Sequence, residues 1–422
     1  MNILFFHPHF PNSFAMLAQH LAMDPNNHVL FLSERGRKDV RMPNVRRISL
    51  APAPLDPRNQ DMPSREMGQA LERAATAANV LLRLQRDGFT PDIVYASASL
   101  GYSLYIRDVF PRSALALYAH WYYTKGENYT FFTRGRERPA ADFAPARVRN
   151  LLQLNGLMDC DMAVTSTEWQ KRQYPEQLQE KFRILPEGVD VRYFAPSPGA
   201  CWRNPEDNAP IDELVTFSAR NRESLNGLNQ FYAMLPRLFA LRPRCHALIM
   251  TPPPPLVDKD GVPYTRRNED KVAVAHHEAL RRCRDQAVAA GVDLHRVHTA
   301  PITSAAGQRM VLQASAVHVY LMPPFTLSAG LLEAMSCGCL VIGSDTPPVR
   351  EVIHEGENGL LCDYWDTAAL ADKIAMALEH RAEMAAQRRA ARALMEREHN
   401  VEALVLQHAD LLMHLRQQTT KA

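Results

Sequence analysis

The chain lacks the features of a membrane-spanning protein, a secreted protein and a cysteine-rich metal protein. No stretch approaches the roughly 20 consecutive apolar residues that a membrane-spanning helix needs. Residues 1–7 have no basic segment ahead of their apolar positions, so they are expected to form a first strand and not a signal peptide. The seven cysteines are scattered, and at Cys337 and Cys339 small packed residues are favoured over a metal or redox pair. We therefore expect a soluble, reduced protein of the cytoplasm; contact with the inner face of the membrane stays open.

The chain also lacks a strong excess of charge of either sign. Its 48 Lys and Arg residues against 46 Asp and Glu residues leave a formal net charge of +2, which gives no argument for a nucleic-acid partner. Apolar residues make up 46% of the sequence, enough for full cores. A length of 422 residues suits two domains of roughly 200 residues each.

Short apolar runs alternate with amphipathic segments in both halves of the chain. Strands are predicted at 3–7, 28–33, 92–96, 114–119 and 162–165, and again at 214–218, 247–250, 317–321 and 340–343. Helices are predicted at 13–23, 66–86, 228–240, 272–289, 307–313, 328–337, 367–379 and 383–415. This alternation predicts an α/β protein with two doubly wound, Rossmann-like domains. Ligands of such sheets bind at the carboxyl ends of the strands, so a cleft between two domains would suit two substrates.

The Pro- and Gly-containing stretch 194–199 is the best candidate for a linker between the halves. It divides the chain into an N-terminal, acceptor-side domain over 1–195 and a C-terminal donor domain over 196–395. The remaining residues, 396–422, are expected to form a helix that packs back on the N-terminal domain.

The segment 325–343 carries the most informative pattern. Thr326 or Ser328 can cap a helix, and Gly338 can close it. The first-turn amides of such a helix can hold a diphosphate, and Gly330 would let the ligand approach the backbone. Glu333 lies more than one turn into the helix, and its residue type alone does not decide between a ligand contact and a carboxylate in solvent.

The segment 331–338, Leu-Leu-Glu-Ala-Met-Ser-Cys-Gly, resembles the signature of the retaining glycosyltransferases of family 4, which have the GT-B fold. Residues 344–361 and 185–190 are similar to further elements of that family, whereas 165–170 and Phe10-Pro11 resemble a bacterial subgroup with a divergent Glu-x7-Glu motif. The resemblance implies transfer of a sugar from a nucleotide-sugar co-substrate, such as a UDP- or GDP-sugar, with retention of configuration. The acceptor would be a saccharide, a lipid-linked molecule or a protein, and neither a cofactor nor a metal is implied.

The resemblance also assigns donor-binding residues. Glu333 would accept hydrogen bonds from the ribose hydroxyls, which suits an ionised carboxylate. Arg220 would hold the diphosphate and stabilise the leaving phosphate during catalysis, with Arg222 as an alternative source of charge because Asn226 stands at the second basic position. Phe325 replaces the usual second Glu, so sugar recognition must differ. The full donor set is Arg220, Arg222, Phe325, Thr326, Leu327, Ser328, Ala329, Gly330 and Glu333.

On the N-terminal side, His120 follows a predicted strand and is expected at its carboxyl end. The resemblance implies a catalytic role for His120 in positioning the donor sugar; a packed or loop histidine is the alternative. The acceptor-side candidates are His9, Asn12, Trp121, Tyr122 and Lys125. The basic stretch from Arg134 to Arg149 would meet a phosphorylated acceptor or an anionic membrane, or form a solvated loop.

Two other functions fit the same architecture. A sugar-nucleotide epimerase would break the same anomeric bond without an acceptor. A degenerate transferase-like subunit would bind a nucleotide sugar or a partner without turnover, a reading that Phe325 and Asn226 support.

Overall fold

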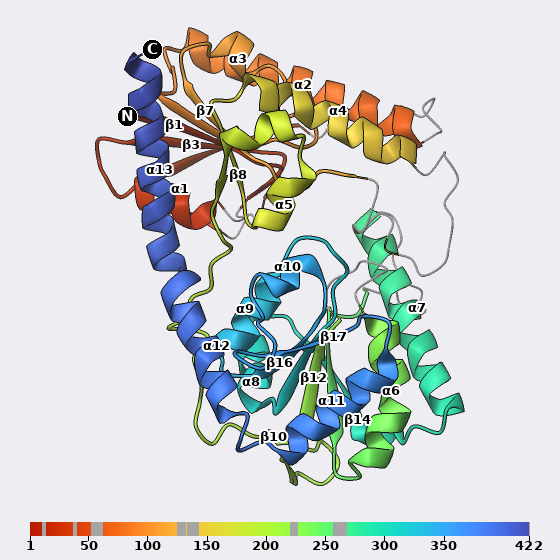
Figure 1. Ribbon diagram of the computed structural model, residues 1–422. Coiled ribbons are helices and arrows are strands. Elements are labelled where there is room, and N and C mark those ends of the chain that lie inside the picture. The colour runs from red at the N-terminus through yellow and green to blue at the C-terminus, as the bar shows by residue number, and fades with distance from the viewer. Residues whose placement is uncertain are drawn as a thin grey trace. The chain divides into compact units, whose positions relative to one another are not determined.

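Two parallel sheets organise the chain, and each is the centre of its own folding unit (Figure 1). The structure is a computed structural model that describes residues 1–10, 14–36, 40–51, 62–124, 132, 143–219, 227–255 and 268–421. Unit 1 comprises Met1–Pro186 and Glu402–Ala422, and unit 2 comprises Glu187–Val401. The prediction of an α/β protein with two Rossmann-like domains is confirmed.

Unit 1 contains a seven-stranded sheet in the order β5-β3-β1-β6-β7-β8-β9, with every neighbouring pair parallel. Its strands are β1 (Asn2–Phe6), β3 (His28–Ser33), β5 (Val45–Ser49), β6 (Ile93–Ser97), β7 (Ala114–Tyr118), β8 (Met162–Thr165) and β9 (Phe182–Ile184). A short pair, β2 (His9–Phe10) and β4 (Arg35–Gly36), lies apart from it. The helices are α1 (Ala15–Leu21), α2 (Met62–Arg86), α3 (Ile106–Val109), α4 (Ala144–Asp159), α5 (Glu168–Gln173) and α13 (Val401–Lys421).

Alternating residues of β1 enter two cores, one on each face of the unit 1 sheet. Leu4 and Phe6 belong to the core that α2, α3 and α4 cover, whereas Ile3 and Phe5 belong to the core shared with α1 and α13. Helix α13 supplies three buried residues to that second core, namely Ala409, Leu412 and Leu415. The expected return of the C-terminal helix to the N-terminal domain is therefore observed.

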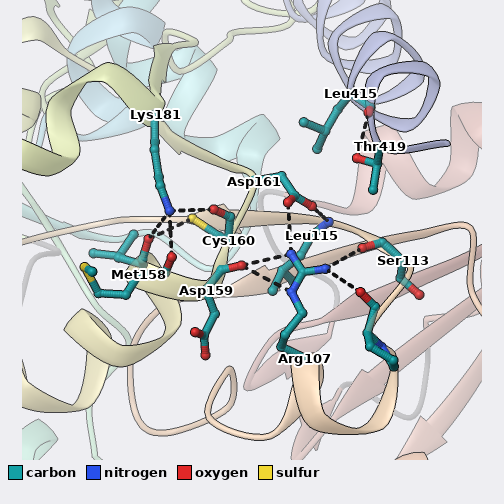
Figure 2. Close-up of polar contacts among 12 residues, drawn as sticks. Arg107, Ser113, Leu115, Met158, Asp159, Cys160, Asp161, Lys181, Leu415 and Thr419 are labelled. Atoms are coloured by element: carbon teal, nitrogen blue, oxygen red, sulfur yellow. Dashed lines mark hydrogen bonds and ion pairs between the residues drawn. The ribbon is translucent and has the colours of Figure 1, made fainter. Parts of the chain in front are cut away.

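The side chains of Lys181 and Arg107 hold the carboxyl end of α4 in unit 1 (Figure 2). The Nζ of Lys181 donates to the carbonyls of Leu157, Met158 and Cys160 at 3.1, 2.7 and 2.8 Å. Arg107 donates to the carbonyl of Asp159 and forms an ion pair with Asp161 at 3.0 Å. The last carbonyls of a helix lack intrahelical partners and carry partial negative charge, so these cations fix where α4 ends.

Unit 2 contains a six-stranded parallel sheet in the order β14-β13-β12-β15-β16-β17. Its strands are β12 (Leu214–Ser218), β13 (His246–Thr251), β14 (Val297–Pro301), β15 (Val317–Tyr320), β16 (Leu340–Ser344) and β17 (Leu360–Cys362). Its helices are α6 (Leu228–Leu241), α7 (Asn268–Ala289), α8 (Ala305–Ala314), α9 (Ala329–Ser336), α10 (Pro347–Arg350), α11 (Thr367–Glu379) and α12 (Ala385–Glu398). Cys337 and Cys339 are buried in the core of this unit.

The division between the units falls at 186/187 and 401/402, not at the expected 195/196 and 395/396. Residues 187–195 belong to unit 2 because Val189, Val191 and Phe194 are buried in its core. The carbonyl of Phe194 also accepts hydrogen bonds from Ser336 at 2.5 Å and from Arg392 at 2.8 Å. Each side chain therefore ties the supposed linker to the helices of unit 2.

The C-terminal segment 383–415, predicted as one helix, is divided into α12 and α13. The backbone of Val189 donates to the carbonyl of His399 at 2.8 Å and accepts from the amide of Val401 at 3.1 Å. These bonds use backbone groups that a continuous helix would need for its own hydrogen bonds. The helix is interrupted at His399 and Asn400 because this stretch pairs with the strand-like segment at Val189.

Among the described residues, no helix is both long enough and apolar enough to cross a membrane.

Candidate functional site

Helix α9 of unit 2 has the start and the end that the sequence predicted. Ser328 occupies the N-cap position with an extended backbone, although its side chain makes no capping hydrogen bond. Its backbone amide donates to the hydroxyl of Tyr320 at 3.0 Å. Gly338 follows the C-cap residue with φ of 77°, a left-handed conformation that favours glycine. Because a helix cannot satisfy its own first amides, the start of α9 is suited to an anion.

A cavity of about 390 Å³ lies at the start of α9. The end of β12, at Ser218, and the end of β15, at Tyr320, both contribute to its wall, as expected for the ligand edge of a parallel sheet. The lining residues are Phe217, Ser218, Gln308, His318, Val319, Tyr320, Leu321, Met322, Ser328, Ala329, Gly330 and Glu333.

The structure brings four of the predicted donor residues together at this cavity, namely Ser328, Ala329, Gly330 and Glu333. The neighbouring Phe325, Thr326 and Leu327 are partly exposed and are not part of the lining. Leu327 instead packs against the core of unit 2. The predicted segment is therefore split, with its C-terminal half at the cavity.

The carboxylate of Glu333 is held at the cavity by a side chain that the sequence reasoning missed. The amide Nε2 of Gln308, a buried residue of α8, donates a hydrogen bond to Oε2 of Glu333. A carboxylate has about four acceptor positions, so this bond orients the group and leaves it able to accept from a ligand. Gln308 lies 25 residues before Glu333, and no local motif connects the two.

The floor of the cavity contains a buried, neutral histidine. Nδ1 of His318 lies 2.8 Å from the hydroxyl of Thr216, which in turn lies 2.7 Å from the hydroxyl of Ser315. Burial lowers the pKa of His318 to about 4, so the imidazole is uncharged at neutral pH. This side of the cavity therefore offers hydrogen-bonding groups without a full charge.

Three residues of the expected phosphate clamp, Arg220, Arg222 and Asn226, lie outside the described residues. The described residues that flank them lie at or beside the cavity. Ser218 belongs to its lining, and Gly227 approaches Leu321 so closely that a Cβ at Gly227 would lie 2.3 Å from the Cβ of Leu321.

A second cavity, of about 380 Å³, lies in unit 1 beside α2 and α4. The predicted residues His120 and Trp121 line it, directly after the end of β7, and Tyr123 joins them. The described residues that line it are Glu66, Gln69, Ala70, Arg73, Ser99, Leu100, His120, Trp121, Tyr123, Arg149, Leu152 and Gln153.

Two other acceptor-side candidates, Tyr122 and His9, are not among the described lining residues of this cavity. The ring of Tyr122 packs against Tyr174 with 5.2 Å between ring centroids, and burial raises the pKa of Tyr122. His9 is exposed in β2, and its backbone amide donates to Nδ1 of His7 at 3.1 Å. Asn12 and Lys125 lie outside the described residues.

The motif at residues 167–170 supports the loop that carries His120. The hydroxyl of Thr167 accepts from the amide of Gln170 at 3.0 Å and so caps α5. The side chain of Gln170 then donates to the carbonyl of His120 at 2.7 Å. Trp169 lies against Trp121 with 5.2 Å between ring centroids. These contacts of the motif therefore position the backbone of His120 and the ring of Trp121.

The expectation that Arg147 and Arg149 belong to a basic loop is wrong, because both lie in α4. Arg149 forms a two-pronged ion pair with Glu66, with N–O distances of 2.9 and 2.5 Å. Glu66 lies on α2, far from Arg149 in the sequence, so the local charge pattern could not predict this ion pair.

Solved structures with a similar fold cover nearly the whole chain. Sucrose-phosphate synthase of Thermosynechococcus elongatus has a TM-score of 0.73 at 16% identity, over 98% of this chain and 99% of that chain. HepE of Anabaena, in complex with UDP and glucose, has a TM-score of 0.66 at 14% identity, over 98% and 100%. An α,α-trehalose-phosphate synthase (UDP-forming) of Burkholderia vietnamiensis has a TM-score of 0.67 at 14% identity, over 100% and 98%. At these identities the likeness shows the GT-B fold.

Two sequence families match the chain. Residues 25–194 match the family described as "Glycosyl transferase family 4 group", and residues 315–394 match "Glycosyl transferases group 1". The chain carries the two domains of a GT-B glycosyltransferase. The second match spans Glu333 and the whole of α9, so it includes part of the lining of the cavity at the start of that helix; Phe217, Ser218 and Gln308 lie outside it. No curated protein matches the chain.

Among the described residues of the glycosyltransferase, no group of three or more His, Cys, Asp or Glu side chains is arranged to hold a metal ion.

Proposed function

We propose that the glycosyltransferase moves a sugar from a nucleotide-diphosphate donor to an acceptor with retention of the anomeric configuration. One observation carries this proposal: the carboxylate of Glu333 and the start of α9 share one cavity at the carboxyl ends of β12 and β15. A carboxylate suits the two vicinal hydroxyls of ribose, and helix amides suit the diphosphate.

The first donors to test are UDP-sugars. Structures of HepE hold UDP or UDP-glucose on a similar fold, which supports this choice of nucleotide. In our proposal Ser328, Ala329 and Gly330 bring their backbone to the diphosphate. Phe325 stands near but outside the described cavity lining, so we assign it to recognition of the sugar and not of the nucleotide.

The proposed reaction exchanges one bond to the anomeric carbon for another. The bond from that carbon to the diphosphate oxygen breaks, the bond to the acceptor oxygen forms, and the acceptor's proton passes to the leaving diphosphate. Arg220 and the α9 amides stabilise the charge on the leaving group, and His120 positions the sugar. These roles require no metal and no protein nucleophile.

The test of the donor site is the substitution Glu333→Gln. The amide keeps the shape of the side chain but loses the charge of the acceptor, and hydrogen bonds to charged groups contribute about 1.5–3 kcal/mol. We therefore expect the Kd for UDP, measured by titration calorimetry, to rise about 10-fold or more. Glu357→Gln is the matched control, because Glu357 belongs to the same unit and its side chain is 78% exposed. Equal affinity in Glu333→Gln and wild type would remove Glu333 from the donor site.

The reaction itself is tested by incubating the wild-type protein with nucleotide sugars, with and without acceptors. A glycosylated acceptor that forms only when acceptor is present supports the transferase, and NMR of that product reports its anomeric configuration. An altered nucleotide sugar formed without acceptor would indicate an epimerase. Nucleotide binding without any turnover would indicate a degenerate subunit.

A further inference from the structure

The charged side chains that line the unit 1 cavity form ion pairs with side chains of opposite charge. Among its described lining residues, three carry a full charge at neutral pH: Glu66, Arg73 and Arg149. Arg149 is paired with Glu66 through two N–O contacts, and this hydrogen-bonded pair raises the pKa of Arg149. Arg73 is paired at 3.1 Å with Glu34, whose side chain is only 8% exposed. Each cation at the cavity wall therefore has a carboxylate of its own.

This pairing determines which ligands the cavity can accept. A phosphate or carboxylate group that takes the paired N–H groups of Arg149 or Arg73 would displace Glu66 or Glu34, and one that takes the remaining N–H groups would lie beside the negative charge of that carboxylate. Removing one member of a partly buried ion pair costs several times more than an exposed pair contributes. The paired wall consequently disfavours anionic ligands, although it is rich in arginine.

The same wall suits a ligand with neutral hydroxyl groups. The Arg149–Glu66 pair presents N–H donors next to carboxylate acceptors, and Gln69, Ser99 and Gln153 add further polar groups. The guanidinium of Arg149 lies 5.2 Å from the centre of the Tyr123 ring, and Trp121 is a further aromatic residue of the lining. Aromatic rings together with hydrogen-bond donors and acceptors match the faces and edges of a sugar ring.

The cavity is also held in shape before any ligand arrives. The side chain of Asn150 accepts from the amide of Tyr123 at 3.0 Å and donates to its carbonyl at 2.7 Å. Gln153 donates to the carbonyl of Trp121 at 2.9 Å. On the opposite wall, Leu100 has φ of 64°, and a Cβ on the adjacent Gly101 would lie 2.5 Å from the carbonyl oxygen of Ala70. A preformed cavity lowers the ordering cost of binding.

We infer that this cavity binds an uncharged sugar ring of the acceptor, and that the paired arginines discriminate against phosphorylated and carboxylated sugars. The inference rests on the proposed transferase function, since it names the acceptor class of that reaction. At about 380 Å³ the cavity is near the lower end of the roughly 300–1,000 Å³ typical of ligand sites, which limits the buried part of the acceptor.

The first experiment compares matched neutral and charged sugars on the wild-type, full-length protein. Methyl glycosides of glucose, galactose and mannose are titrated beside their 6-phosphates and the corresponding uronates, with binding followed by saturation-transfer NMR. We expect at least one neutral glycoside to bind 10-fold or more tightly than both of its charged counterparts. Equal or tighter binding of the charged forms would overturn the inference, as would a lack of binding by every neutral glycoside.

The second experiment assigns the binding to this cavity. Glu66→Gln keeps the size of the side chain but leaves Arg149 without its carboxylate. We expect the neutral glycoside to bind about 10-fold more weakly to this variant, and the ratio of charged to neutral affinity to rise at least 10-fold. Asp372→Asn is the matched control, because Asp372 forms an equally two-pronged pair with Arg237 on the exposed surface of unit 2. Wild-type preference retained in Glu66→Gln would place the sugar elsewhere.

Failure of this inference is distinguishable from failure of the proposed function. If UDP does not bind and no nucleotide sugar is turned over, the proposed function fails. If UDP binds with dependence on Glu333 but charged sugars are preferred, only the acceptor class is wrong. The wild-type comparison also does not depend on whether Glu66→Gln folds.

Discussion

The largely buried His408 of α13 predicts that the docking of that helix on unit 1 is sensitive to pH. The ring of His408 lies edge-on to Tyr95, with 4.9 Å between ring centroids. Its Nε2 atom is enclosed, and no hydrogen-bond partner reaches it among the described residues. Burial lowers the pKa of His408 from 6.5 to about 4, because the charged imidazolium would lose its hydration. The folded protein therefore holds the ring neutral.

The sign and the size of the effect follow from this depressed pKa. Below pH 6.5 the undocked helix binds a proton at His408 that the docked helix does not bind until about pH 4. Stability is thus complete above pH 6.5 and is lost as the pH falls toward 4. With these two values, the loss between pH 7 and pH 5 is about 2 kcal/mol from this one group.

The perturbation is His408→Phe, which keeps an aromatic ring against Tyr95 but cannot be protonated. Hydrogen exchange of α13 peptides, measured by mass spectrometry at pH 7 and pH 5 and corrected for intrinsic exchange rates, gives the opening free energy of the helix. We expect the variant to lose about 2 kcal/mol less than the wild type over this interval. His414→Gln, on the exposed side of the same helix, is the control. Equal losses in His408→Phe and wild type would refute the reasoning.

Two further predictions concern helix ends. Lys181→Met removes three hydrogen bonds to the carboxyl end of α4 and should lower the free energy of unfolding of unit 1, measured in urea, by about 1–3 kcal/mol. The control Arg172→Met, at an exposed position, should have little effect. Gly338→Ala forces a side chain into the left-handed region at φ of 77° and should cost about 1–2 kcal/mol, seen as a lower melting temperature. In contrast, Gly307→Ala in α8 meets no atom closer than 3.6 Å and should be neutral or stabilising by up to about 1 kcal/mol. Equal melting shifts for the two glycine variants would contradict the conformational argument.

Buried strands were the most predictable part of the fold. The predicted strands 28–33, 162–165 and 214–218 agree with β3, β8 and β12 residue for residue, because each is a short, mostly apolar run. The strand β14 (Val297–Pro301) was missed. It lies at the edge of its sheet, and the adjacent His298 and Thr299 interrupt its apolar residues.

Contacts between distant segments were not predictable in the same way. The position of Gln308 against Glu333 depends on how α8 packs beside α9, and the Glu66–Arg149 pair depends on the packing of α2 against α4. The sequence nevertheless indicated where the sites lie, because Glu333 and His120 follow local rules of helix and strand ends. Packing then supplied the partners that no local pattern contains.

The second crossing of the chain between the units, at 401/402, has a consequence for the order of synthesis. Unit 2 is one continuous segment, 187–401, and all of it but Val401 precedes α13 in the order of synthesis. Synthesis of unit 1 begins before that of unit 2 but is completed after it. Three buried side chains of the unit 1 core that contains residues of α1 belong to the 21-residue helix α13. Until that helix is synthesised, the part of this core that α13 covers stays exposed on the nascent N-terminal sheet, and such apolar surface is the kind that holding chaperones bind. We therefore expect the unit that begins at the N-terminus to reach its native state only after the C-terminal helix leaves the ribosome.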